Sequence, residues 1–165
     1  MWAVVKFDKK YLNLMQEDFK KKIGSKCLIY RPKILIQKYT KNKLVNKEFY
    51  ILNNYIFCYH KEFKDKSITN KLKFTKGLKY FLEGFRDYQK DIRDFIEKCK
   101  SLEDTNGYIS QSFFDLKKNS NYKFTSGPFV EKIFKIISFE KNKLNILIGE
   151  LKTTINRKDY FFSPL

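Results

Sequence analysis

The sequence predicts an α+β protein with two domains: an N-terminal α/β sandwich around a four-stranded, mostly antiparallel sheet, and a small C-terminal β-barrel. Two observations predict this class. Segments with helical periodicity alternate with short β-rich segments over the first hundred residues, and a polar stretch then leads into a tail with strand-like alternation. The chain has 165 residues, of which 42% are hydrophobic, which is enough to build two small cores.

The N-terminal part contains both kinds of segment. Tyr11–Ile23 has apolar residues at three- and four-residue steps and a basic last turn, and Gly24 follows as a stop signal. Tyr88–Lys100 shows the same periodicity after a candidate cap, Asp87. The other predicted elements are a short helix at Lys66–Phe74, strands at Trp2–Phe7, Lys26–Arg31, Ile34–Tyr39, Phe49–Tyr59 (with a break at Asn53-Asn54) and Lys79–Phe85, and a basic hairpin-tip loop at Thr40–Lys47.

The tail has two possible interpretations. Ile133–Phe139 and Leu144–Ile148 flank the polar Glu140–Lys143, which favours a hairpin within a small barrel. Apolar residues also recur at helical spacing from Val130 and from Leu144, so two amphipathic helices would satisfy the pattern as well. We prefer the barrel and predict a first domain at 1–102, a linker at 103–120 and a second domain at 121–165.

Charge and composition restrict the function further. The net charge is +17, and residues 1–100 hold 25 Lys or Arg against 11 Asp or Glu, a field that attracts phosphate backbones. Over-use of Lys, Asn and Ile by an AT-rich genome would give a similar excess. We expect no membrane span, a cytoplasmic location and a monomer.

Catalytic chemistry is not predicted. His60 is the only histidine and is expected at the surface, which argues against a histidine-based triad or a zinc site. Cys27, Cys58 and Cys99 are widely spaced and suit reduced core positions. No glycine-rich phosphate loop occurs, so we expect no enzyme, no cofactor and no metal.

Four short segments carry a family resemblance. Tyr122-Lys-Phe-Thr-Ser-Gly-Pro-Phe129 resembles the opening of a KOW module, and Met1-Trp-Ala-Val-Val-Lys-Phe-Asp8 resembles the first strand of the NusG N-terminal (NGN) domain. Leu52-Asn-Asn-Tyr-Ile-Phe57 matches the family's Phe-Pro-Gly-Tyr turn at Tyr55 but lacks its Phe and Pro. Phe74-Thr-Lys-Gly-Leu78 matches the family's Thr-Pro-Gly-Val stretch at Gly77, with a basic residue as in the RfaH branch, while Phe134 replaces a later KOW glycine. The chain therefore resembles the NusG family, and within it the specialised RfaH-like paralogs.

The resemblance implies a transcription elongation or antitermination factor with an NGN-type domain and an SH3-like KOW barrel. Such a factor binds the β′ clamp helices of RNA polymerase, bridges the cleft to the β subunit and increases processivity by favouring the closed clamp. The corresponding positions for the clamp-helix site are Leu52, Tyr55, Leu78 and Phe81, of which Leu78 and Phe81 also suit ordinary core positions. Those on the β-subunit side are Ile68, Thr69, Asn70 and Lys71.

Further contacts are implied for nucleic acid and for the tail. Lys9, Lys10, Thr75 and Lys76 match the region that touches the non-template DNA strand, although each lysine alone also suits a solvated surface. Gly127, Pro128 and Phe129 form the KOW turn. The tail's implied partners are a ribosomal protein of the NusE type or Rho, and in RfaH the tail can instead form an α-helical hairpin. The alternative function is an RNA-binding KOW-type module associated with the ribosome.

Overall fold

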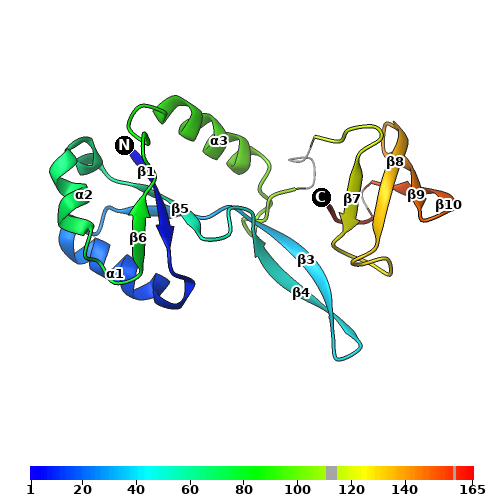
Figure 1. The fold of residues 1–165 in the computed structure, drawn as a ribbon, viewed down its shortest axis with the longest axis horizontal. Helices are drawn as coiled ribbons and strands as arrows, with labels where there is room; N and C mark the ends of the chain where they lie inside the picture. The colour runs from blue at the N-terminus through cyan, green and yellow to red at the C-terminus, as the bar shows by residue number, and fades with distance from the viewer. Residues whose placement is uncertain (111–114, 158) are drawn as a thin grey trace. The chain divides into compact units, whose positions relative to one another are not determined.

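The computed structural model describes residues 1–110, 115–157 and 159–165, which form two units (Figure 1). The first unit comprises Met1–Pro32 and Tyr50–Ser101, and the second comprises Lys33–Phe49 and Leu102–Leu165. The segment Lys33–Phe49 thus belongs to the second unit, although it lies between two parts of the first in the sequence.

The first unit is built on a four-stranded antiparallel sheet in the order β2-β5-β1-β6. These strands are β1 (Trp2–Phe7), β2 (Leu28–Tyr30), β5 (Tyr55–Tyr59) and β6 (Leu78–Phe81). The central strand β1 buries successive residues, because Val4 lies on one face while Ala3 and Val5 lie on the other. A strand that is apolar on both faces needs cover on both, and this requirement places it in the middle of a sandwich.

Three helices supply the cover. On α1 (Leu12–Ile23), Met15 and Phe19 are buried, and the Phe19 ring stacks on Phe81 of β6 with 6.3 Å between centroids. On α3 (Gln89–Ser101), Phe95 packs on Phe57 of β5 at 5.7 Å. Helix α2 (Lys66–Leu72) follows a 3₁₀ turn at Lys61–Lys64 and buries Ile68 and Leu72.

The second unit contains a five-stranded antiparallel sheet in the order β10-β9-β8-β7-β11. Its strands are β7 (Asn121–Phe124), β8 (Ile133–Glu140), β9 (Lys143–Ile148), β10 (Leu151–Asn156) and β11 (Phe162–Pro164). An aromatic cluster fills its core, in which Phe134 lies 4.3 Å from Phe124 and 5.6 Å from Phe162 between ring centroids. Phe134 is therefore a central core residue of this unit.

A separate two-stranded ribbon, β3 (Lys33–Thr40) and β4 (Lys43–Tyr50), completes the second unit. Ile34 and Ile36 at its base are buried, whereas all of β4 before Tyr50 is exposed. Gln37 fixes the ribbon to the five-stranded sheet β10-β9-β8-β7-β11, which we call the barrel: its backbone N–H donates to the Thr125 carbonyl at 2.6 Å, and its side-chain oxygen accepts from the Gly127 N–H at 2.9 Å.

The predicted fold class is confirmed, with an antiparallel four-stranded sandwich and a β-rich C-terminal part. The tail segments with two possible periodicities are strands in the structure. The predicted hairpin tip lies within Thr40–Lys47, but the predicted loop was too long, since only Lys41 and Asn42 lie between the strands. Strand β6 ends at Phe81 rather than Phe85, and α3 begins at Gln89, with the Asp87 N–H donating to the Gly84 carbonyl in the preceding turn.

Two further sequence expectations concern single residues. His60 is buried at 5% exposure, not at the surface: its Nδ1 accepts from the Glu62 N–H, and its ring packs edge-on against Phe63. All three cysteines are buried, as expected of core residues. In the part of the predicted linker that is described, the Asp104 carboxylate accepts from the backbone of Asn106 and Tyr108, while residues 111–114 lie outside the description. Within the described ranges, no helix has the length and apolar character to cross a membrane.

Candidate functional site

A cluster of three polar side chains lies on one face of the first unit's sheet. Lys6 on β1 stands opposite Tyr55 on β5 and Tyr80 on β6, so all three side chains point to the same side. The Lys6 ammonium lies 4.9 Å from the centre of the Tyr55 ring and 5.6 Å from that of Tyr80. The two phenol oxygens are 2.9 Å apart and share a hydrogen bond. We call this group the Lys6–Tyr55–Tyr80 patch.

The patch is accessible and electrostatically coupled. Tyr80 is 46% exposed, while α3 covers the same face further along, at Phe57. Hydrogen bonds to the phenol of Tyr55, and then of Tyr80, raise the pKa of Lys6 above its ordinary value, and those from Tyr80 and Lys6 lower the pKa of Tyr55. The lysine therefore stays charged at neutral pH beside two aromatic rings. Such a surface suits a partner that brings both apolar contacts and a carboxylate.

The other predicted clamp-helix residues do not all join this patch. Phe81 pairs with Val5, so it lies on the opposite face, inside a ring cluster with Phe19 and Phe63. Leu78 and Leu52 are half-buried against the same core. Leu52 accepts the backbone N–H of Tyr55 in the turn that opens β5. Tyr55 is thus the predicted residue best placed for a partner, and Lys6 and Tyr80 are its neighbours that sequence reasoning missed.

Helix α2 carries the four residues predicted for the β-subunit side, Ile68 to Lys71. Asp65 caps the helix by accepting from the Ser67 N–H at 2.8 Å and the Ser67 hydroxyl at 2.7 Å, and these bonds lower the pKa of the Asp65 carboxyl. Ile68 is buried and Thr69 turns its hydroxyl back to the Lys66 carbonyl, whereas Asn70 and Lys71 are exposed. The helix therefore offers Asn70 and Lys71 to solvent and uses Ile68 as its anchor.

Two of the predicted nucleic-acid residues, Lys10 and Lys76, lie beside the ring of Tyr11. Lys76 lies over one side of its ring at 4.7 Å, and Lys10 lies 5.6 Å from the same centroid. Gly77 lets the chain after Lys76 pass close to Tyr11: its φ is +91°, and a Cβ at this position would lie only 2.7 Å from the Tyr11 Cβ. Lys9 is exposed in the 3₁₀ turn Lys9–Tyr11. We call Lys9, Lys10, Tyr11 and Lys76 the Tyr11 cluster.

The two residues that precede Lys76 in the sequence differ sharply in exposure. Thr75 is only 3% exposed, and its hydroxyl accepts from the Lys22 ammonium at 3.0 Å, so it holds the turn from inside. Phe74, by contrast, is 88% exposed, an unusual position for a phenylalanine. The sequence shows an aromatic residue between the polar Lys73 and Thr75, and in the structure it lies two residues after the end of α2 at Leu72. An exposed aromatic ring beside cations can stack on a nucleic-acid base.

The predicted KOW turn lies in the second unit. Gly127 has a φ of +74°, and a Cβ there would approach the Tyr160 ring to 3.0 Å. The Val130 N–H closes the turn on the Gly127 carbonyl, and Phe129 packs on Phe124 at 5.6 Å between ring centroids. Pro128 is exposed. The turn joins β7 to β8 and receives Gln37 of the ribbon.

No protein-family model matches the chain, and no curated protein matches it. Among solved structures, the chain is similar to the MjSpt4:Spt5 complex in its conformation B, at 11% identity and a TM-score of 0.29, over 100% of this chain and 98% of that one. It is also similar to NusG of Thermotoga maritima, at 18% identity and a TM-score of 0.31, over 94% and 91% of the two chains. Similarity of this extent does not assign a function.

Proposed function

We propose that this protein is a transcription elongation factor of the NusG type, which binds RNA polymerase through the first unit and increases processivity. The observation that carries the proposal is the Lys6–Tyr55–Tyr80 patch, centred on the residue where the NusG-like turn motif matches best. The antiparallel sandwich and the separate β-rich unit agree with the NGN and KOW arrangement that the motifs imply.

The proposed contacts use side chains of the first unit. The tips of the β′ clamp helices would pack on the Tyr55 and Tyr80 rings, with Lys6 pairing a carboxylate, and Leu52 and Leu78 would support the edge. Asn70 and Lys71 of α2 would face the β subunit. A factor that binds the closed clamp about tenfold better than the open one shifts that equilibrium tenfold, which needs only about 1.4 kcal/mol.

The Tyr11 cluster would hold the exposed non-template DNA strand. Lys9, Lys10 and Lys76 supply phosphate contacts, and Phe74 supplies a stacking surface for one base. The basic residue at Lys76 supports an RfaH-like, antiterminating paralog. For the KOW-like unit, the proposed partners are a ribosomal protein of the NusE type or Rho.

The test is binding of the full-length protein to core RNA polymerase. Tyr55→Ala should weaken binding by about 30-fold, the roughly 2 kcal/mol of an interface hot spot. Tyr88→Ala is the matched control, because Tyr88 is another well-exposed tyrosine of the same unit, in the turn before α3, and is not one of the three patch residues. Equal losses in the two variants would argue against the patch as the anchor.

The net charge of +17 favours one other candidate, an RNA-binding module associated with the ribosome. Absence of polymerase binding, together with tight and steeply salt-dependent binding to ribosomal RNA fragments, would establish that candidate instead. Binding to polymerase through an aromatic anchor should depend only weakly on salt.

A further inference from the structure

The β3–β4 ribbon is an unusual surface for a small protein. It pairs with no further strand in the described residues, and its outer half is exposed on both faces. Lys41 and Asn42 form its two-residue turn with φ values of 50° and 61°, the left-handed pair of a type I′ hairpin. The Gln37 side chain donates to Asn46 at 3.1 Å, in the register that this turn predicts.

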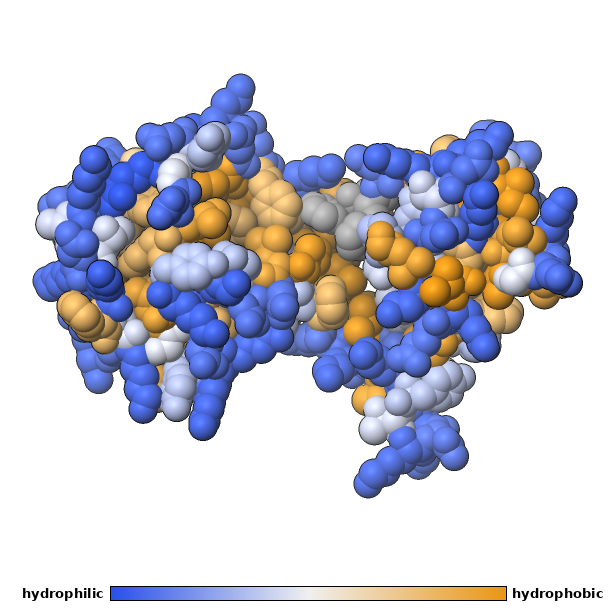
Figure 2. Space-filling view, in the orientation of Figure 1, coloured by the Kyte–Doolittle hydropathy of each residue, from blue (hydrophilic) through white to orange (hydrophobic). Residues whose placement is uncertain are grey.

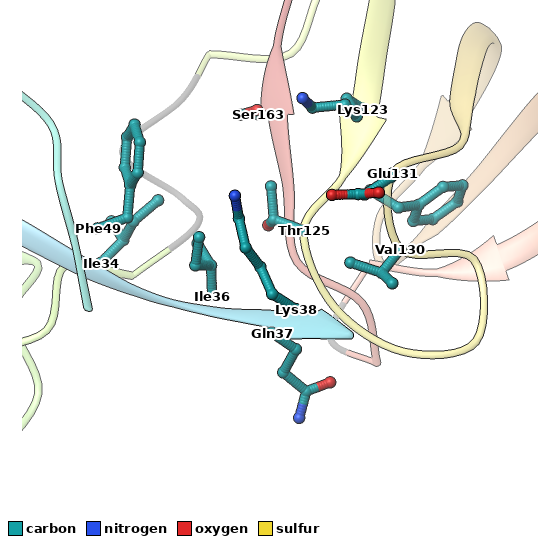
Figure 3. A pocket seen from close by; sticks show the side chains of 11 residues that line it. Ile34, Ile36, Gln37, Lys38, Phe49, Lys123, Thr125, Val130, Glu131 and Ser163 are labelled. Atoms are coloured by element: carbon teal, nitrogen blue, oxygen red, sulfur yellow. The ribbon is translucent and has the colours of Figure 1, made fainter. Parts of the chain in front are cut away.

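Successive side chains along each strand of the ribbon point to opposite faces. Ile34, Ile36 and Lys38 lie on one face of the ribbon, and Gln37 lies on its opposite face (Figure 3). The hairpin register adds Lys43 and Lys47 to that face. Lys41 lies at the tip, so the outer half of the ribbon carries four exposed lysines: Lys38, Lys41, Lys43 and Lys47.

Their charge is not neutralised within the ribbon. Its one carboxylate, Glu48, is held at the base by the Lys33 ammonium at 2.8 Å and by the Tyr108 hydroxyl at 3.0 Å. The ion pairs that join Lys33 to Glu48 and Lys22 to Asp18 use none of these four lysines. Glu131 lines the pocket that Lys38 and Lys123 also line, but it forms no ion pair with either. In Figure 2 the projecting end of the ribbon is hydrophilic.

We propose that this ribbon binds the phosphate backbone of double-stranded B-form DNA, a site separate from the Tyr11 cluster. Four uncompensated lysines on a narrow element match a dense line of phosphates. A two-stranded ribbon fits the major groove of B-DNA, which is about 12 Å wide, whereas the major groove of A-form RNA is too narrow. A single-strand site would need several stacking rings, and Tyr39 is the only aromatic residue between Gln37 and Lys47.

The barrel provides a control with the same chemistry. The β8–β9 hairpin carries Lys135, Lys141 and Lys143, and Lys132 directly precedes it; all four are exposed. Replacing either set of four lysines by Gln removes the same charge from the same full-length protein. A third variant, with the four ribbon lysines replaced by Arg, keeps the charge and tests whether the ribbon still folds and binds.

The experiment is fluorescence anisotropy with a labelled 20-base-pair DNA duplex between 50 and 200 mM salt. The ribbon Gln variant should bind at least tenfold more weakly, and the slope of log K against log salt should fall by about 3 to 4, since each lost phosphate contact removes about 0.9. The barrel Gln variant should change affinity less than about threefold, and the Arg variant should bind as the unaltered protein does.

Three outcomes would overturn the proposal. Equal losses in the two Gln variants would mean that only net charge matters. Binding of double-stranded RNA or single-stranded DNA as tightly as duplex DNA would remove the argument from groove shape. A ribbon Gln variant with unchanged affinity and salt slope would place the DNA contacts elsewhere. Because no polymerase is present, the result is independent of the function proposed above.

Discussion

The same four residues, Lys-Asn-Lys-Leu, form the tips of two hairpins with opposite surroundings. They occur at 41–44 in the β3–β4 ribbon and at 141–144 in the β8–β9 hairpin of the barrel. Leu44 is 41% exposed, whereas Leu144 is 1% exposed. Each sequence makes a turn of two residues between strands, although the two turns differ in backbone conformation. Burial is decided by which other strands lie alongside.

The difference shows what holds each hairpin. In the barrel, β8 pairs with β7 and β9 with β10, and Leu144 faces Phe139 and Ile155 across the strands. The ribbon has no such flanking strands, and an isolated two-stranded hairpin is only marginally stable in water. Its stability has to come from the base, where Ile34, Ile36 and Gln37 meet the barrel. A hairpin held only at its base keeps its tip available for a partner.

The largest expected contrast is between the two leucines. Leu144→Ala should lower the free energy of unfolding of the barrel by about 2–5 kcal/mol, because it leaves a cavity in a packed core. Leu44→Ala, the same change at the matching position of the ribbon, should cost less than about 0.5 kcal/mol. Urea unfolding followed by circular dichroism gives both values. Similar losses in the two variants would show that the ribbon tip is buried in solution.

A smaller effect tests the ribbon's attachment. Gln37→Ala removes the acceptor of the partly buried Gly127 N–H, which should cost about 1–3 kcal/mol and speed hydrogen exchange at Gly127. Asn46→Ala is the control: it removes only the exposed Gln37–Asn46 bond and should leave the Gly127 amide protected. If Gly127 exchanges equally in both variants, Gln37 is not the residue that holds the ribbon.

The two hairpins also show which parts of the fold could be predicted. The β8–β9 hairpin was predicted because Leu144 and Ile146 alternate with polar residues, the pattern of a strand with one buried face. The outer ribbon has no buried face, so its lysines suggested a loop. Periodicity reports burial and not hydrogen bonding, and a strand that is exposed on both sides leaves no such pattern.

The sequence also predicted only part of the candidate site. Tyr55 was found by motif and lies in an accessible patch, yet Lys6 and Tyr80 join it only through the register of β1 with its two neighbours. Phe81, predicted beside Tyr55, lies on the other face, because the pairing of Val5 with Phe81 was not deducible from sequence. Phe74 was visible as an aromatic among polar residues, but its 88% exposure depends on where α2 ends.

The smallest contrast lies in the turns themselves. In the ribbon both turn residues have positive φ, whereas in the barrel only Lys141 does, at 39°. Asn tolerates this region far better than Ala, so Asn42→Ala should destabilise the ribbon by about 1 kcal/mol, while Asn142→Ala should cost only a few tenths. Hydrogen exchange of the β4 amides reports the first change and that of the β9 amides the second. Asn42→Gly should preserve the ribbon, because glycine adopts positive φ freely. Loss of protection in the Gly variant as well would mean that the Asn42 side chain, and not the backbone conformation, holds the turn.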